Sequence, residues 1–186
     1  FTHSQGKTKR VALEEFFKYL HEAVKPEGIV MSADLFGMTA TNNDDLNIGQ
    51  ILERALPYFD YIAPMVYPSH YPSGFNGYKD VNAHAYDIVN YSMKIAVERT
   101  IATTTAEGSF AYTRIGTTSP AIYAKPAYSK YKIRPWLQDF DYPVEYTPAM
   151  VREQIRASED AGLNSYMFWD PGNKYSSLKQ VVAPAQ

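Results

Sequence analysis

The chain has 186 residues, with 18 Lys and Arg against 20 Asp and Glu, and it contains no cysteine. The missing cysteines exclude disulfide scaffolds, zinc fingers, iron–sulfur clusters and thiol nucleophiles. The net charge of −2 argues against a nucleic-acid partner, and no apolar run approaches the roughly 20 residues of a membrane span. The chain starts at Phe1 without a basic segment followed by an apolar stretch, so we expect no signal peptide in it.

Residues 11–24 form the first predicted helix, because their apolar positions recur every three or four residues. The segment Lys-Pro-Glu-Gly at 25–28 ends this helix. The apolar run 29–33 that follows has no polar alternation, which is typical of a parallel strand covered on both faces. This predicted strand ends at Asp34.

The same order of helix and strand recurs along the rest of the chain. Further helices are predicted at 47–56, 85–97 and 148–161, and further strands at 61–66, 131–137 and 165–169. Residues 100–130, rich in Thr, Ala, Ser and Tyr, form a long insertion before the third strand. Within this insertion we expect a hairpin around Glu107 and Gly108.

This alternation predicts an α/β fold whose four strands are parallel and adjacent in chain order. A doubly wound sheet and part of a (β/α)8 barrel both fit the pattern. No glycine-rich phosphate-binding turn follows a strand, whereas polar and aromatic residues follow every strand. Chemistry at the carboxyl ends of the strands is typical of barrels, so a partial TIM barrel of four strands is favoured.

Two carboxylates stand at predicted strand ends, Asp34 after the first strand and Asp139 after the third. Glycoside hydrolysis uses two carboxyl groups on either side of a sugar, one of them acting as an acid. We therefore expect Asp34 and Asp139 to share one cleft as catalytic residues, with their carboxyl groups about 5 to 10 Å apart. The alternative is that each aspartate only caps a helix or a turn.

Aromatic and polar side chains near these carboxylates are the candidates for substrate binding, because flat rings can stack on the apolar faces of sugars. Three alternatives remain: packing of the aromatic loop on its neighbours, structural pairing of Arg134, and a turn cap at Asp170. The candidate substrate-binding residues are Tyr67, His70, Tyr71, Arg134, Trp136, Gln138, Trp169, Asp170 and Asn173.

The sequence predicts neither a metal site nor a cofactor. Its four histidines, His3, His21, His70 and His84, are far apart and show no metal-binding spacing. The acidic run at 42–45 lacks the spacing of an EF-hand and is interpreted as a solvated loop. No G-x-S-x-G segment occurs, which argues against a serine hydrolase.

Four segments together resemble one known family. They are Ser-Ala-Asp-Leu-Phe-Gly at 32–37, Pro-Met-Val-Tyr-Pro-Ser-His-Tyr at 64–71, Ile-Arg-Pro-Trp-Leu-Gln-Asp-Phe at 133–140 and Gln-Ile-Arg-Ala at 154–157. They are similar to the glycoside hydrolase family DUF4015, also called glycoside-hydrolase-like family 10. The resemblance extends over residues 10–178 and implies a (β/α)8 barrel in which this chain supplies strands five to eight.

The same resemblance implies roles for single residues. Asp34 corresponds to an acid/base position on the fifth strand, and Asp139 corresponds to a stabilising carboxylate on the seventh. The family carries a further candidate catalytic Asp in a Phe-Asp-Tyr-Ile-Arg-Phe-Pro motif on the fourth strand, which should lie before residue 1. On the last strand the family has Trp-Asn, whereas this chain has Trp169 followed by Asp170.

Three functions are compatible with these observations. The first is a glycosidase domain that acts on a polysaccharide or oligosaccharide by carboxylate acid/base catalysis. The second is a catalytically silent carbohydrate-binding barrel, and the third is a half-barrel fragment that serves in assembly. The expected partners are a carbohydrate and either an N-terminal half-barrel or a second copy of the chain. The resemblance implies an extracellular or cell-envelope location.

Overall fold

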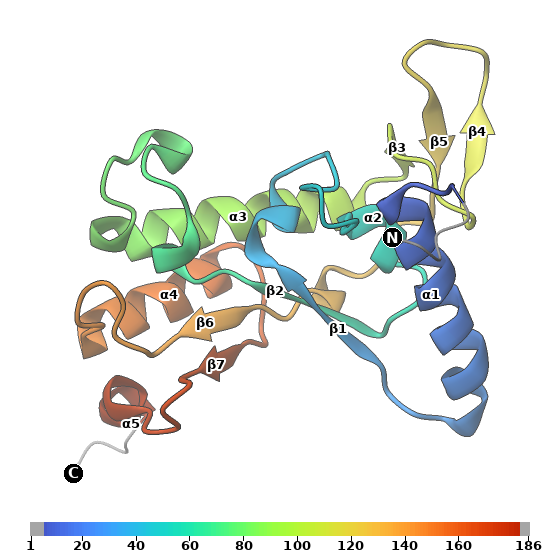
Figure 1. Cartoon of the computed structure of the whole chain (residues 1–186). Coiled ribbons are helices and arrows are strands. Elements are labelled where there is room, and N and C mark those ends of the chain that lie inside the picture. The colour runs from blue at the N-terminus through green and yellow to red at the C-terminus, as the bar shows by residue number, and fades with distance from the viewer. Residues whose placement is uncertain (1–5, 183–186) are drawn as a thin grey trace.

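The computed structural model describes residues 6–182 and contains a four-stranded sheet, flanking helices and a smaller projecting sheet (Figure 1). No helix of this described part is long and apolar enough to cross a bilayer. The helices are α1 (Lys9–Val24), α2 (Leu52–Ala55), α3 (Ala85–Ile101), α4 (Pro148–Asp160) and α5 (Ser176–Val182). The strands are β1 (Ser32–Phe36), β2 (Tyr61–Met65), β3 (Thr104–Thr105), β4 (Thr113–Ile115), β5 (Ile122–Ala124), β6 (Trp136–Gln138) and β7 (Met167–Trp169).

The main sheet has the strand order β1-β2-β6-β7, and every neighbouring pair is parallel. The prediction of four parallel strands adjacent in chain order is therefore confirmed. Strands β1 and β2 align from Ser32 opposite Tyr61 to Phe36 opposite Met65. Gly37 directly follows β1, and a Cβ atom there would overlap the carbonyl oxygen of Met65. Glycine at position 37 thus permits the backbone after β1 to lie close to the end of β2.

The first strand is displaced from its predicted position at 29–33. Asp34 is consequently the central residue of β1 instead of the residue after its end. Burial alternates along β1, since Ala33 and Leu35 are buried whereas Ser32 and Asp34 are exposed. The expectation of cover on both faces is wrong for this strand, because one face of the sheet carries no helix or strand from residues 6–182. We call this side the open face.

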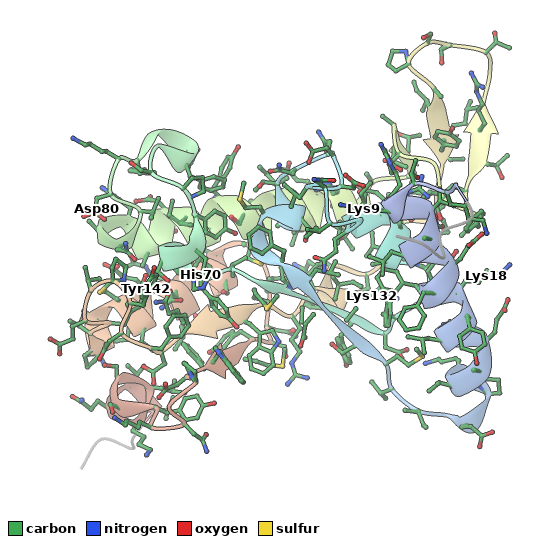
Figure 2. All side chains as sticks on the ribbon, viewed as in Figure 1. Lys9, Lys18, His70, Asp80, Lys132 and Tyr142 are labelled. Carbon is green, nitrogen blue, oxygen red and sulfur yellow. The ribbon has the colours of Figure 1, made fainter. Side chains whose placement is uncertain are left out.

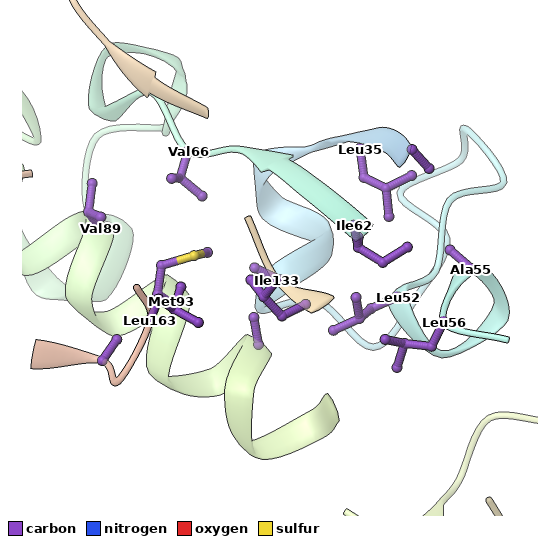
Figure 3. Packing of buried hydrophobic residues seen from close by; sticks show 14 of the residues in the cluster. Leu35, Leu52, Ala55, Leu56, Ile62, Val66, Val89, Met93, Ile133 and Leu163 are labelled. Atoms are coloured by element: carbon purple, nitrogen blue, oxygen red, sulfur yellow. The ribbon is translucent and has the colours of Figure 1, made fainter. Parts of the chain in front are cut away.

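The opposite side of the main sheet is the hydrophobic core. Leu35, Ile62 and Ile133 project from the sheet region toward α2 and α3, where they meet residues such as Leu52 and Met93 (Figure 3). All five side chains are at most 1% exposed. The alternate positions of the strands carry polar and aromatic residues such as Asp34 and Trp136, which meet on the open face.

Local sequence signals explain where the longer helices begin and end. The hydroxyl of Thr147 accepts a hydrogen bond from the backbone N–H of Met150, and Pro148 occupies the first turn of α4. Gly162 follows α4 with a left-handed φ of 85°, which favours glycine. The predicted helix at 47–56 shortens to α2, because Asn47 and Gly49 adopt left-handed backbone conformations.

The smaller sheet has the strand order β3-β5-β4 and is antiparallel. The hairpin predicted around Glu107 and Gly108 is wrong, because β4 and β5 are joined by residues 116–121 instead. Glu107 accepts hydrogen bonds from Arg54 and Arg10, and a Cβ on Gly108 would lie 3.0 Å from the ring of Tyr123. Residues 107 and 108 therefore pack against α1, α2 and the Tyr123 ring of β5, and they do not form the turn of a hairpin.

Candidate functional site

Asp34 and Trp136 meet on the open face of the main sheet. The indole Nε1 of Trp136 donates a hydrogen bond to Oδ1 of Asp34 at 2.9 Å. Because β2 lies between β1 and β6, the side chain of Trp136 must span β2 to reach Asp34. The β2 residue opposite Asp34 is Ala63, whose small side chain leaves room for this crossing. The indole N–H therefore orients an exposed carboxylate.

Trp169, the last residue of β7, adds a second indole to the site. The ring centroids of Trp136 and Trp169 are 6.0 Å apart at an interplanar angle of 83°, an edge-to-face contact. Trp169 is 45% exposed, so the pair presents aromatic surface to solvent. The structure thus brings together three of the predicted site residues, one carboxylate and two indoles.

Tyr67, the second residue after β2, belongs to the same site. Tyr67 is 7% exposed, and burial raises the pKa of its hydroxyl, with a smaller upward contribution from the negative charge of Asp34. Tyr175 was not predicted from the sequence. It lies in the segment after β7 with a left-handed φ of 51°, and no motif around it distinguishes it from an ordinary loop residue.

Asp170 and Asn173 are turn residues in the segment after β7. The Asp170 carboxylate accepts hydrogen bonds from the backbone N–H groups of Gly172, Lys174 and Tyr175, each at 2.8 or 2.9 Å. Burial alone would raise the pKa of Asp170, but these N–H groups lower it below its usual range. The exposed Asn173 donates its backbone N–H to the carbonyl of Asp170. The structure therefore matches the alternative that Asp170 caps a turn and so positions Tyr175.

Gln138 is fully buried, and its side chain is occupied by protein groups. Its Oε1 accepts hydrogen bonds from the N–H and the hydroxyl of Ser69, at 3.3 and 2.9 Å. Its Nε2 donates to the carbonyl of Phe140 at 3.0 Å and to that of Tyr142 at 3.4 Å. A direct contact with substrate, as expected from the sequence, does not fit this environment. Gln138 instead joins the loops that follow β2 and β6.

Asp139, the residue after β6, is buried beside α5. Its side chain is 6% exposed, and Oδ1 accepts a hydrogen bond from the backbone N–H of Leu178 in α5 at 3.0 Å. Its Oδ2 is buried and has no hydrogen-bond partner among residues 6–182. Burial raises the pKa of Asp139, and the carboxylates of Asp170 and Asp141 raise it further. No hydrogen bond or ion pair within the described chain joins Asp139 to Asp34, and their shared cleft stays a prediction.

The remaining candidates have different surroundings. His70 lies beside Tyr67, with ring centroids 5.5 Å apart. Tyr71 points into the core, where its hydroxyl accepts a hydrogen bond from Ser92 of α3, so it does not join the open face. The guanidinium of Arg134 lies 5.8 Å from the ring centre of Tyr61, a cation–π contact on the sheet below Trp136.

This arrangement supplies one solvent-accessible carboxylate with a fixed orientation and an aromatic surface beside it. Such a carboxylate can exchange a proton with a bound oxygen atom or accept a hydrogen bond from a hydroxyl group. Rings with polar edges can contact both apolar and polar faces of a ligand. Within residues 6–182, no three His, Asp or Glu side chains are grouped to hold a metal ion.

Comparison with known proteins adds independent evidence on the family and the fold. Residues 1–175 match the family model DUF4015, described as "Putative glycosyl hydrolase domain". The fold is similar to that of the PgaB (BpsB) glycoside hydrolase domain from Bordetella bronchiseptica, with a TM-score of 0.54 at 14% sequence identity. The match covers 96% of this chain and 43% of that one, so the chain spans less than half of its structural neighbour. No curated protein matches the sequence.

Proposed function

The chain belongs to the DUF4015 family of glycosyl hydrolase domains, and we propose that it acts on a polysaccharide or oligosaccharide with Asp34 as a catalytic carboxylate. The observation that carries this proposal is the hydrogen bond from Trp136 to the exposed carboxylate of Asp34. Trp169, which is 45% exposed and packs edge-on against Trp136, adds aromatic surface suited to a sugar ring.

The proposed catalysis needs a second carboxyl group, for which Asp139 is the candidate in this chain. A general acid at neutral pH requires a raised pKa, and burial raises that of Asp139. Against this role, Asp139 is buried beneath α5 and bonded to Leu178. Asp34 is therefore the better supported of the two proposed catalytic residues.

We also propose that the main sheet is half of a (β/α)8 barrel, with β1, β2, β6 and β7 as its last four strands. Support comes from the parallel order of these strands, from their two unpaired edges within residues 6–182, and from the open face. In a closed barrel the open face would be the interior, and catalytic residues would stand at the carboxyl ends of the strands. The missing strands would come from an N-terminal half-barrel or a second copy of this chain.

A catalytically silent carbohydrate-binding barrel is the second candidate function. The buried position of Asp139 favours it, because a carboxyl group that is 6% exposed has little access to a bound sugar. In that case the two tryptophans would bind a glycan, and Asp34 would only accept hydrogen bonds from its hydroxyl groups.

The test measures glycan binding and the release of reducing ends from a panel of polysaccharides. The proteins are the chain alone, the chain extended upstream by about four βα units, and the variants Asp34→Asn, Asp139→Asn and Glu22→Gln. We expect Asp34→Asn to abolish hydrolysis while binding is retained, and the exposed Glu22 on α1 to tolerate its substitution. Binding without hydrolysis in every protein would establish the silent barrel, and the absence of binding would overturn both candidates.

A further inference from the structure

Four rings gather where the loops after β2 and β6 meet, and we call them the rim cluster: Tyr67, His70, Phe140 and Tyr142. Tyr67 contacts Phe140 edge-on at 5.3 Å between ring centroids, and His70 contacts the same ring at 5.8 Å. Tyr142 extends the cluster through His70, at 6.1 Å. The rings of two separate loops thus form one continuous aromatic surface.

Gln138 fixes the two loops relative to each other. Its amide accepts hydrogen bonds from Ser69, beside His70, and donates to the carbonyl groups of Phe140 and Tyr142. A fully buried amide with partners on both loops restricts their relative motion, because breaking these bonds would leave buried polar groups unsatisfied. The rings are therefore held in place before any ligand arrives, which lowers the entropic cost of binding.

The rim cluster is open to solvent on one side. Tyr142 is 59% exposed, His70 is also exposed, and Phe140 is half-buried. His70 and Tyr142 lie next to each other on the same side of the molecule (Figure 2). Partial burial of the ring lowers the pKa of His70, which favours its neutral form. The surface is aromatic, uncharged and edged with hydroxyl and ring nitrogen groups.

Tyr67 connects the rim cluster to the proposed catalytic site. Its ring contacts His70 and Phe140, and it follows β2, the strand that lies between Asp34 on β1 and Trp136 on β6. Trp136 and Trp169 stand at the same carboxylate. Tyr67 itself is only 7% exposed, so the solvent-accessible rings are the two indoles at Asp34 and, on the other side of this contact, His70, Phe140 and Tyr142.

We propose that the rim cluster is a second sugar-binding subsite. It would hold one sugar unit of a glycan while the adjacent sugar unit lies at Asp34. The inference rests on the proposed function and adds that the length of the glycan matters for binding. A single sugar can occupy the Asp34 site alone, whereas a longer glycan gains the contacts of His70, Phe140 and Tyr142. The site would therefore prefer oligosaccharides over monosaccharides, and it would engage a polymer along its length.

The two tryptophans of the chain, Trp136 and Trp169, both lie at the Asp34 site, so intrinsic tryptophan fluorescence reports binding there specifically. Titrations would use cello-, chito- and maltooligosaccharides of one to six residues, together with the polymers from which they derive. The variant Tyr142→Ala removes the most exposed ring of the cluster and leaves both tryptophans unchanged. Tyr131→Ala is the matched control, since Tyr131 is 48% exposed and lies outside the cluster.

We expect the affinity of the unaltered chain to rise with oligosaccharide length. Tyr142→Ala should weaken binding of the longest bound oligomer about ten-fold and leave the monosaccharide unaffected, while Tyr131→Ala binds like the unaltered chain. Length-dependent affinity that Tyr142→Ala and a second variant, His70→Ala, leave unchanged would overturn the subsite while the proposed function stands. Affinity independent of length would do the same. If no saccharide binds, the proposed function fails and the subsite with it.

Discussion

Glu14 of α1 shows how much one buried carboxylate can hold together. It is 0% exposed and accepts hydrogen bonds from Arg54, from the hydroxyl groups of Tyr58 and Ser109, and from the backbone N–H of Phe110. These partners come from the α2 region and from the segment that leads to β4. One side chain thus fixes α1, α2 and the base of the smaller sheet.

Replacing Glu14 with Gln should lower the free energy of unfolding by about 2 kcal/mol, because it removes the charge from a fully buried hydrogen-bond acceptor while Arg54 keeps its ion pair with Glu107. The same substitution at Glu15, whose ion pair with Lys7 is 41% and 39% exposed, should cost less than about 1 kcal/mol. Urea unfolding followed by circular dichroism measures both values. Equal losses in the two variants would contradict the assigned role of Glu14.

Asp139 should make the stability of the chain depend on pH. Its pKa is raised in the folded state by burial and by Asp170 and Asp141, so the folded state favours the protonated form. Its contribution to stability is therefore complete below the unfolded pKa and is lost as the pH rises through the higher folded pKa. Asp139→Asn should consequently become more stable relative to the unaltered chain as the pH is raised from 3 to 7 in urea unfolding experiments. A difference that stays constant with pH would rule out this titration.

Among the helices, α4 and α1 offer a direct comparison of capping. Thr147 before α4 accepts a hydrogen bond from Met150, whereas Thr8 before α1 makes no capping hydrogen bond with its side chain. Thr147→Ala should therefore lower the free energy of unfolding by about 1 kcal/mol, and Thr8→Ala should cost only a few tenths. Thermal and urea unfolding of the two variants check the difference, and a larger loss from Thr8→Ala would contradict it.

The longer helices and the parallel order of strands could be predicted because their signals are local and periodic. Strand boundaries could not, since β1 alternates between the core and the open face while the purely apolar residues Ile29 and Val30 precede it in solvent. The sequence cannot reveal which face of a sheet stays uncovered, because that depends on what packs there. For the same reason the third predicted strand, 131–137, differs from the observed strand β6, which covers only residues 136–138.

The candidate site was partly predictable for a related reason. Asp34 on β1 and Trp136 on β6 flank β2 in the same parallel sheet, so the long indole can reach the carboxylate across one strand. Gln138 and Tyr71 were assigned to substrate from their position near strand ends, but burial decides otherwise for both. Tyr175 could not be found, because its place depends on the turn that Asp170 caps.

At the scale of the whole molecule, exposed apolar surface accompanies the unpaired strand edges. Phe16 and Tyr19 of α1 are 52% and 65% exposed, beside the exposed Ile29 and Val30. Strand edges and apolar surface of this kind are normally covered in proteins. The proposed half-barrel would be covered by the segment or copy that completes it.

A chain extended upstream by about four βα units should therefore unfold at a higher urea concentration and bind less of the dye ANS than the 186-residue chain. It should also hydrolyse a glycan that the shorter chain only binds weakly. Analytical ultracentrifugation separates the alternative, in which two copies of the shorter chain cover each other. Full turnover by a monomer of the shorter chain would contradict the need for further strands.

The crossing of Trp136 over β2 places a limit on how this sequence can vary through evolution. The residue opposite Asp34 on β2 is Ala63, and we expect a longer side chain there to crowd the indole on its way to Asp34. Substitutions at 63 and 136 should therefore be correlated among homologues, with a small residue at 63 wherever a tryptophan stands at 136. Lineages that lose the indole would be free to enlarge position 63, and their aspartate would then need a different hydrogen-bond donor.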